Sequence, residues 1–257
     1  SAIDYCICIE ELARVDPAVA LSVAAHNGLC AAHIALAGSE QQKQQYLVPL
    51  ARGEKIGAWG LTESTSGSDA AVMRTTAAKS GGDWVLNGSK TFTTHGRIGD
   101  VLVVMAVTSP RALRGKGVSA FIVEKGTPGF SPGKKEDKLG MRASDTSEVR
   151  LENCRVPADH LLGKEGHGFI DTMQVLDAGR IGIAALAVGL AQGAYEAAVH
   201  YARERTAFGK TIGSFQAIQW KLADNATRIE AARLLTYRAA YLKDRAERTT
   251  LESAMAK

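Results

Sequence analysis

The middle of this 257-residue sequence is built from short β-branched segments, whereas the sequence on both sides of it has helical periodicity. From Lys55 to about Leu162, segments such as "VLVVMAVTS" and "VSAFIVEKG" are separated by Gly, Asn, Asp and Pro, which is typical of strands in an all-β unit. Apolar residues recur at helical spacing before Gly53 and again after "GKEGHGF". This order favours an α+β fold with segregated domains over an alternating βαβ sheet.

Two local motifs give sharper expectations. Ser39 followed by Gln42 predicts a capping box at the start of a helix in "SEQQKQQYLVPLARG". The sequence "NGSK" at Asn87 to Lys90 predicts a hairpin turn, because Asn-Gly accepts the positive φ angles of a tight turn.

Charge and composition argue against several classes of partner. The net charge of +4 is small against 31 basic and 27 acidic residues, and no basic block is interleaved with aromatics, so we expect no nucleic acid. No uninterrupted apolar run approaches the roughly 18 residues of a membrane-spanning helix. The cysteines lack CxxC spacing and the histidines form no HExxH motif, so we expect a reducing compartment, no metal, and surface or packing roles for the histidines.

The two ends of the chain lack the usual signals of natural termini. The sequence opens without methionine inside a helical pattern and closes in "LESAMAK" with no helix stop signal. We therefore expect a chain truncated at both ends, in which any targeting peptide would lie upstream.

The common nucleotide and nucleophile motifs are missing from the sequence. It has no GxGxxG and no GxSxG, and "ERTAFGKT" has Glu204 where a phosphate-binding loop needs its first glycine. The polar stretch "GLTESTSGSD" remains: its hydroxyls and the glycine Gly67 suit a ligand such as a pyrophosphate or a flavin edge. A solvated Ser/Thr-rich turn explains the same residues, and taken alone they favour the turn.

Several motifs in the same order make the chain similar to one family. "GLTESTSGSD", "KTFTTHG", "GKKEDKLGMRASDTSEVRLENCRVP", "GFIDTMQVLDAGRIGIAALAVGLAQ" and "YARERTAFGKTIGSFQAIQWKLAD" together resemble the acyl-CoA dehydrogenases, most closely their short-chain (butyryl-CoA) branch. The resemblance covers the whole chain. It implies the end of an N-terminal helical domain at 1–54, a central β-barrel-like domain at 55–165 and the start of a C-terminal helical bundle at 166–257.

The resemblance also implies a flavin site that holds FAD. Thr62 would hydrogen-bond the pyrimidine edge of the ring, Thr94 would donate to flavin N5, and Gly67 and Ser68 would lie toward the phosphates and the CoA arm. Ser64 replaces the family's usual proline, which loosens this loop. The residues implied to contact the ring or cover it are Trp59, Leu61, Thr62, Phe92, Thr93 and Thr94.

A second group of residues matches positions that reach the FAD of a neighbouring subunit. These are Arg205, Phe208, Phe215 and Gln216, with the Arg205 guanidinium suited to phosphate oxygens. An arginine on a helix surface paired with Glu204 or another acid explains Arg205 equally well on sequence alone. The match implies a homo-oligomer, expected to be a tetramer.

The resemblance implies that the acyl-CoA substrate contacts Ser68 and several residues of the segment 166–257. Asp177 and Arg180 match positions that line the CoA channel, although an i, i+3 ion pair is the plainer interpretation and both can hold. Phe169 and Leu176 would line the acyl side, where ordinary core packing is the alternative.

The catalytic base is the one functional group that the resemblance does not locate in the sequence. Most of the family carries a glutamate in a C-terminal loop that has no counterpart before Lys257, and other branches carry it at the position of Gly179, which cannot abstract a proton. We expect the base beyond Lys257.

The resemblance predicts FAD-dependent α,β-dehydrogenation of a short-chain acyl-CoA, with an electron-transfer flavoprotein as electron acceptor. The alternatives are an acyl-CoA oxidase, a dehydrogenase of branched or aromatic acyl-CoA, and a non-catalytic binding or assembly protein. We expect a cytoplasmic location in a bacterium or the mitochondrial matrix in a eukaryote.

Overall fold

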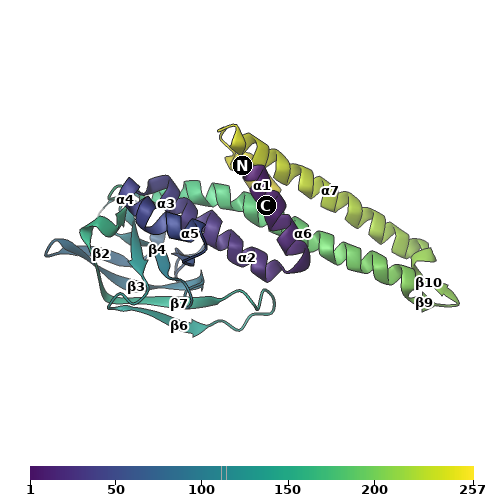
Figure 1. Ribbon diagram of the computed structural model, residues 1–257, viewed down its shortest axis with the longest axis horizontal. Helices are drawn as coiled ribbons and strands as arrows, with labels where there is room; N and C mark the ends of the chain where they lie inside the picture. Colours follow the sequence, from purple (N-terminus) through teal and green to yellow (C-terminus); the bar gives the residue numbers. More distant parts are fainter. Residues whose placement is uncertain (111, 114) are drawn as a thin grey trace. The chain divides into compact units, whose positions relative to one another are not determined.

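A computed structural model describes residues 1–110, 112–113 and 115–257. Contacts between residues divide the chain into two compact units. One unit combines Ser1–Leu21 with Asp177–Lys257, and the other is the continuous segment Ser22–Leu176. The chain therefore orders helices, then strands, then helices, as the sequence predicts (Figure 1).

The unit 22–176 is organised around strand β4 (Val101–Val107), whose side chains alternate between two buried clusters. Val101, Val103 and Met105 pack in one cluster with residues of the helical segment, and the intervening Leu102 and Val104 pack in the other. Both faces of β4 are therefore buried, which explains why its sequence is an uninterrupted apolar run.

An eight-stranded sheet carries these clusters, in the order β6-β7-β3-β2-β4-β5-β8, with β1 pairing parallel to β4. The second cluster joins side chains of β4 and β5 to side chains of β3 and β7, so the sheet packs against itself. The strands are β1 (Gly57–Gly60), β2 (Thr76–Ser80), β3 (Asp83–Thr94), β5 (Val118–Glu124), β6 (Phe130–Lys135), β7 (Thr146–Val156) and β8 (Leu161–Leu162).

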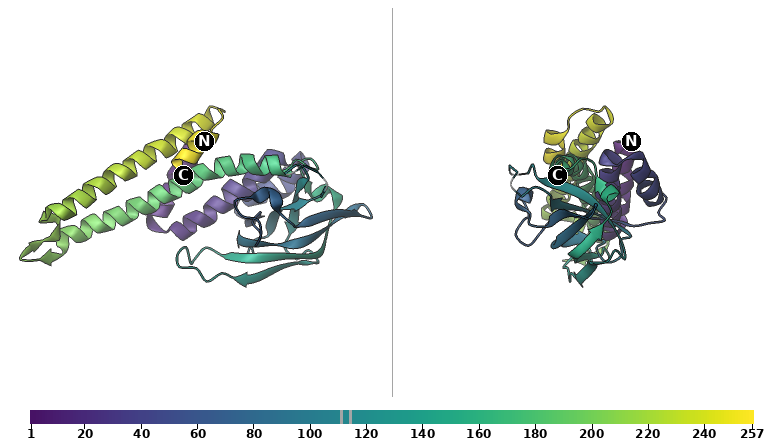
Figure 2. Two further views of the ribbon diagram at one scale, coloured as in Figure 1. Left: turned by 180° about the vertical axis from the view of Figure 1, so that it is seen from behind. Right: turned by 90° about the vertical axis from the view of Figure 1, so that its left-hand side faces the viewer.

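Short helical pieces lie along one side of these strands in both Figure 1 and Figure 2. The capping box is confirmed: Ser39 Oγ accepts from the Gln42 N–H at 3.1 Å, and Gln42 Oε1 accepts from the Ser39 N–H at 3.0 Å. In chain order the pieces are α2 (Pro17–Ala25), the π-helix η1 (His26–Ala31), α3 (Ala32–Ala37), α4 (Glu40–Gln42), the π-helix η2 (Lys43–Leu47) and α5 (Val48–Ala51), with the 3-10 turns η3 (Ala70–Val72) and η4 (Ala158–His160) further on.

The hairpin predicted at Asn87 to Lys90 is wrong. These residues lie inside β3, and the chain turns instead at Gly81 and Gly82, both with positive φ, between β2 and β3. Gly88 has φ 147° at a shift of register against β7, and a Cβ there would lie 2.5 Å from Thr75 Oγ1. The glycine therefore serves a bulge and a close contact rather than a turn.

The other unit consists of helices α1 (Ala2–Val15), α7 (Gln216–Asp244), α8 (Thr250–Ala256) and the part of α6 (Gly168–Glu204) from Asp177 onward. Helix α6 leads into the hairpin β9 (Thr206–Ala207) and β10 (Lys210–Thr211), followed by the turn η5 (Ile212–Ser214) and α7. A Cβ on Gly189 would lie 2.1 Å from the Glu10 carbonyl oxygen. Helices α1 and α6 therefore approach closely at this glycine.

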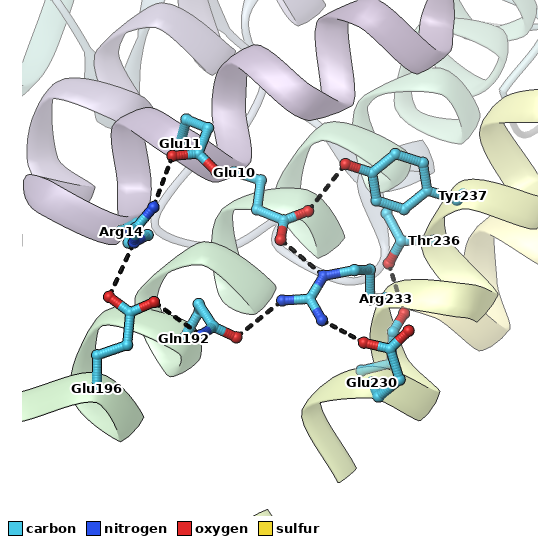
Figure 3. A network of polar contacts seen from close by, with 10 residues as sticks. Glu10, Glu11, Arg14, Gln192, Glu196, Glu230, Arg233, Thr236 and Tyr237 are labelled. Atoms are coloured by element: carbon cyan, nitrogen blue, oxygen red, sulfur yellow. Dashed lines mark hydrogen bonds and ion pairs between the residues drawn. The ribbon is translucent and has the colours of Figure 1, made fainter. Parts of the chain in front are cut away.

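A polar network joins α1, α6 and α7 in this unit (Figure 3). Arg233 donates from Nε to Glu10 Oε1 at 2.8 Å and from Nη2 to Gln192 Oε1 at 2.9 Å. Tyr237 donates its hydroxyl to Glu10 Oε2 at 3.0 Å. The buried Glu10 carboxylate is thus bound by two donors from α7, which compensates for its removal from water.

Two helical stretches, Pro17–Ala37 and Gly168–Glu204, meet a mean-hydropathy and length criterion for membrane spans, although neither is an uninterrupted apolar run. Core helices of folded domains meet the same criterion, and 39% and 44% of their most apolar windows are buried in the structure. The criterion is therefore weak evidence for a membrane span.

Candidate functional site

The polar stretch after β1 forms a tight turn that is closed by its own backbone. The Glu63 N–H donates to the Ser66 carbonyl at 2.9 Å, and the Ser66 N–H donates back to the Glu63 carbonyl at 3.1 Å. Ser66 Oγ donates to the Asp69 carbonyl at 2.9 Å. The stretch is therefore a turn, and Gly67 and Ser68 are exposed at its end.

A buried ion pair lies beneath this turn. Lys90 Nζ on β3 lies 2.7 Å from Glu63 Oε1 and also donates to the Leu61 carbonyl at 3.2 Å. The remaining acceptor positions of Glu63 take hydrogen bonds from Thr75 and the Arg74 backbone. The carboxylate and the ammonium therefore both have partners, which a buried ion pair requires.

Burial and charge act in opposite directions on this pair. Burial pushes the pKa of Glu63 upward, but the Lys90 ammonium and hydrogen bonds from Thr75 hold it below its ordinary value. Burial also lowers the pKa of Lys90, against the attraction of Glu63. The geometry, with Lys90 fully buried and bound to a carboxylate, supports a charged pair.

Strand β3 bulges immediately after Lys90. Its register against β7 shifts between Lys90 and Thr93, and Phe92 adopts φ 53°, a left-handed conformation that is rare for an aromatic residue. The Thr91 N–H donates to the Thr62 carbonyl at 2.8 Å, which ties the bulge to the polar stretch. Phe92 is 66% exposed as a result.

The bulge and the end of β1 enclose a hollow of about 160 Å³, which we call the aromatic hollow. Two aromatic rings, small apolar side chains and threonine hydroxyls form its wall. Its residues are Ala25, Leu29, Trp59, Leu61, Thr62, Thr91, Phe92 and Thr94.

The aromatic hollow suits part of a flat, polar-edged ring system. Trp59 and Phe92 offer aromatic surfaces, and Thr62 and Thr94 offer hydroxyl groups. The Thr91 hydroxyl is buried with no hydrogen-bond partner among the described residues, so it is not exposed to the hollow. These side chains fit one edge of an isoalloxazine ring, the reactive part of FAD.

Five of the six predicted ring-contact residues therefore line the aromatic hollow, namely Trp59, Leu61, Thr62, Phe92 and Thr94. Thr93 is not in the lining: it is 1% exposed and lies opposite Ser147 on β7. The bulge interrupts the strand alternation here, because Lys90 and Thr93 are buried three residues apart while Thr91, Phe92 and Thr94 line the hollow. A flavin contact for Thr93, and roles for Gly67 and Ser68, stay predictions.

The residues predicted to reach a neighbouring subunit gather at the β9–β10 hairpin in the helical unit. Phe208 is 95% exposed with φ 52°, and its ring lies 6.2 Å, edge to face, from the ring of Phe215. Lys210 Nζ lies 4.5 Å from the centre of the Phe215 ring, a cation that sequence reasoning missed. Glu204 Oε1 lies 3.4 Å from His200 Nε2.

The predicted substrate residues divide between the two units. Asp177 and Arg180 form the expected i, i+3 ion pair, and Asp177 Oδ2 also accepts from the Thr250 hydroxyl at 2.8 Å. Phe169 is partly buried against the first core cluster of the unit 22–176, as the packing alternative predicts. Substrate contacts of these residues and of Leu176 stay predictions.

Family models match the chain in the order of the fold. The N-terminal, middle and C-terminal domain models of acyl-CoA dehydrogenases match residues 1–54, 58–154 and 166–257. Fold and matches together define a flavoprotein oxidoreductase. The chain belongs to the acyl-CoA dehydrogenase family.

Curated relatives point to the short-chain branch of that family. The chain is 49% identical to the short-chain specific acyl-CoA dehydrogenase of Clostridium acetobutylicum, over 99% of this chain and 67% of that protein. It is 48% identical to the mitochondrial short-chain specific enzyme of Mus musculus, over 98% of this chain and 61% of that protein. The chain thus spans about two thirds of the length of these relatives.

Solved structures agree with this placement. Butyryl-CoA dehydrogenase from Megasphaera elsdenii matches with TM-score 0.97 and 45% identity, and the match covers 100% of this chain and 67% of that chain. A chain in a structure described as electron transferring flavoprotein of Acidaminococcus fermentans matches with TM-score 0.98 and 48% identity, with the same coverage. PigA in complex with FAD matches with TM-score 0.94 and 33% identity, over 100% of this chain and 67% of that one. The predicted family and fold are confirmed.

Proposed function

We propose that the protein dehydrogenates a short-chain acyl-CoA thioester to the trans-2-enoyl-CoA with FAD as cofactor. The observation that carries this proposal is the aromatic hollow, in which Trp59, Thr62, Phe92 and Thr94 meet above the Glu63–Lys90 pair. The short-chain specific relatives support the substrate class. The whole protein's activity is proposed, since the chain covers about two thirds of those relatives.

Each side chain of the hollow has a distinct task in this proposal. Trp59 and Phe92 hold the ring by its faces, and apolar Leu61, Leu29 and Ala25 keep water from one edge. Thr94 orients the ring by its hydroxyl, at the position implied for N5. When bound, FAD supplies the acceptor for the hydride that leaves the β-carbon.

The Glu63–Lys90 pair contributes rigidity. Glu63 directly follows Thr62, and Lys90 lies two residues before Phe92, so the ion pair holds both segments in place. The Thr91 N–H also donates to the Thr62 carbonyl. The two segments that would contact the ring are therefore bound to each other before a ligand arrives, which lowers the entropy lost on binding.

The α-proton needs a base that these residues do not provide. Its removal requires a carboxylate with a raised pKa, together with hydrogen bonds to the thioester carbonyl. Gly179 has no side chain for this task and lies within α6. A glutamate outside residues 1–257 stays the prediction for the base.

The β9–β10 hairpin supports an oligomer in which Arg205, Phe208, Phe215 and Gln216 reach the FAD of a second subunit. Phe208 is nearly fully exposed, and the cation Lys210 lies against Phe215. Together with Arg205 this gives an aromatic and cationic tip suited to adenine and phosphate. We propose a tetramer of this kind.

The electron acceptor and the location are proposed from the relatives. The structure described as an electron transferring flavoprotein supports such a protein as the acceptor. The relatives include bacterial and mitochondrial enzymes, which supports the bacterial cytoplasm or the mitochondrial matrix.

The test is the visible absorption spectrum of the purified protein before and after butyryl-CoA without oxygen. We expect a flavin band that butyryl-CoA bleaches. T94V should slow the bleaching about five- to tenfold through loss of one hydroxyl, whereas T76V, an exposed β2 control, should not.

The other functions give different outcomes. Rapid reoxidation by oxygen would indicate an oxidase, and bleaching only by branched or aromatic acyl-CoA would change the substrate class. A protein without a flavin band even after reconstitution with FAD would contradict the enzyme and leave a binding or assembly role.

A further inference from the structure

The indole of Trp59 is held by a histidine behind the aromatic hollow. Trp59 Nε1 donates to His33 Nδ1 at 3.1 Å, and the two ring centres are 6.3 Å apart with planes inclined by 49°. Trp59 lies on β1 and His33 on α3, so the hydrogen bond joins a strand of the sheet to a helix beside it. Nε1–H is the only hydrogen-bond donor of the indole ring.

This bond sets the chemistry of both rings. His33 Nδ1 accepts a proton donor, so the ring is neutral and carries its hydrogen on Nε2. Because its only donor is directed at His33, Trp59 can meet a ligand with its π surface but cannot donate a hydrogen bond to it.

His33 is an unusual choice for a packing residue. Its side chain is 0% exposed, and its Nε2 is buried with no hydrogen-bond partner among the described residues. A buried polar group without a partner is unfavourable, and a leucine would avoid this loss. The imidazole thus brings an energetic disadvantage that its bond to Trp59 must offset.

A second histidine on the same helical stretch binds the same strand. His26 Nδ1 accepts from the Gly57 N–H at 3.0 Å. His26 and His33 are seven residues apart, and the groups they accept from belong to Gly57 and Trp59, two residues apart on β1. The helical stretch therefore fixes both the backbone of β1 and the side chain through which β1 contacts the hollow.

We propose that His33 is a positioning residue that fixes the plane of the Trp59 indole as one wall of the flavin site. This inference rests on the proposed function. Without the acceptor at His33, the indole can rotate about its side-chain torsions and its N–H lacks a partner, so the wall is less well ordered before the ring binds.

The test compares two substitutions of similar size. H33N keeps an acceptor at the position of Nδ1, and H33L replaces it with an apolar group. FAD affinity and the visible circular dichroism of the bound flavin are measured for the purified protein. We expect H33L to weaken FAD binding about fivefold and to change the flavin dichroism, and H33N to stay within about twofold of the wild type.

Stability provides the control for a merely structural role. At a buried site Leu is favoured over Asn, so we expect H33L to be the more stable variant and the weaker FAD binder. FAD affinity that follows stability, with H33L binding better than H33N, would overturn the inference.

The substitution W59F tests the other end of the bond without changing His33. It removes the donor, so adding H33L to W59F should produce no further loss of FAD affinity. An unchanged fivefold effect of H33L in the W59F protein would contradict the inference. Should neither His33 variant fold, W59F must itself weaken FAD binding and alter the flavin dichroism, and wild-type behaviour would overturn the role of the bond.

Failure of the proposed function gives a separate result. A wild-type protein that binds no FAD contradicts the flavin site itself. The bond is then tested by NMR from the Trp59 indole N–H signal, which is assigned by its loss in W59F. This signal should shift in H33L and keep its position in H33N. Equal positions in the wild type, H33L and H33N would contradict the bond.

Discussion

Lys90 Nζ lies 2.7 Å from Glu63 Oε1, and Lys90 is fully buried while Glu63 is 7% exposed. The pair joins the turn that follows β1 to the strand that carries Phe92 and Thr94. The ion pair therefore joins two of the segments that line the aromatic hollow, the one that ends at Thr62 and the one that begins at Thr91.

Removing one partner of this pair should destabilise the protein strongly. K90M leaves the Glu63 carboxylate buried without its cation, and we expect the free energy of unfolding to fall by about 3 to 5 kcal/mol. The double variant E63Q/K90M should lose less than K90M, because no uncompensated charge remains. Urea unfolding measures both.

The exposed pair between Lys79 and Glu165 is the matched control. It has nearly the same separation, 2.8 Å, but side chains that are 67% and 41% exposed. We expect E165Q to change stability by less than about 1 kcal/mol. Equal losses in K90M and E165Q would contradict an anchor that depends on burial.

The left-handed conformation of Phe92 should make glycine better than alanine at this position. Its φ of 53° is strained for any residue with a Cβ, so we expect F92G to be about 1 kcal/mol more stable than F92A without ligand. Both variants should bind FAD more weakly through loss of the ring. At Thr76, an exposed residue of β2, the order should reverse, because glycine weakens an ordinary strand. Thermal unfolding of the four variants decides this, and F92A more stable than F92G would show that the strain is absent.

Acid should destabilise the wild-type protein more than H33N. Burial lowers the pKa of His33 from 6.5 to about 4, so between these pH values the unfolded chain binds a proton that the folded protein excludes. The stability of wild type relative to H33N should therefore fall by about 3 kcal/mol as the pH drops from 7 to 4, and stay constant above pH 7. Burial also lowers the pKa of His95, which both proteins keep, so the comparison isolates His33. A pH-independent difference between the two unfolding curves would contradict a neutral, buried His33.

The sequence predicts the order of helices and strands because each segment carries its own periodicity. It also predicts the capping box at Ser39, because both partners lie three residues apart. The hairpin at Asn87 is wrong because the same Asn-Gly pair also suits a bulge, and only the pairing of β3 with β7 decides between the two.

The site was predictable only in part. The family resemblance named Trp59, Thr62, Phe92 and Thr94, and the fold brings them together. The burial of Lys90 was predictable from the sequence, although it was not predicted. Lys90 lies an even number of residues after the inward-facing Trp84 and Leu86, so strand alternation places it at a buried position of β3. His33 had no such signal, because its partner Trp59 is 26 residues away and the contact exists only once α3 packs on β1.

Gly67 should separate ligand binding from folding. A Cβ at this exposed position would meet no atom of the described residues within 4 Å, and the backbone does not adopt positive φ, so the unliganded turn has no need of glycine. We expect G67A to be slightly more stable than wild type, by about 0.4 to 1 kcal/mol, through a less flexible unfolded chain.

Gly140 meets the same two conditions in the loop between β6 and β7, and G140A is the matched control. If the phosphates or the CoA arm approach the backbone at Gly67, G67A should weaken FAD or butyryl-CoA binding about tenfold while G140A leaves both unchanged. Titration of FAD into the apoprotein and of butyryl-CoA into the flavin-loaded protein measures these affinities, and wild-type affinity for both ligands in G67A would place the turn outside the binding site.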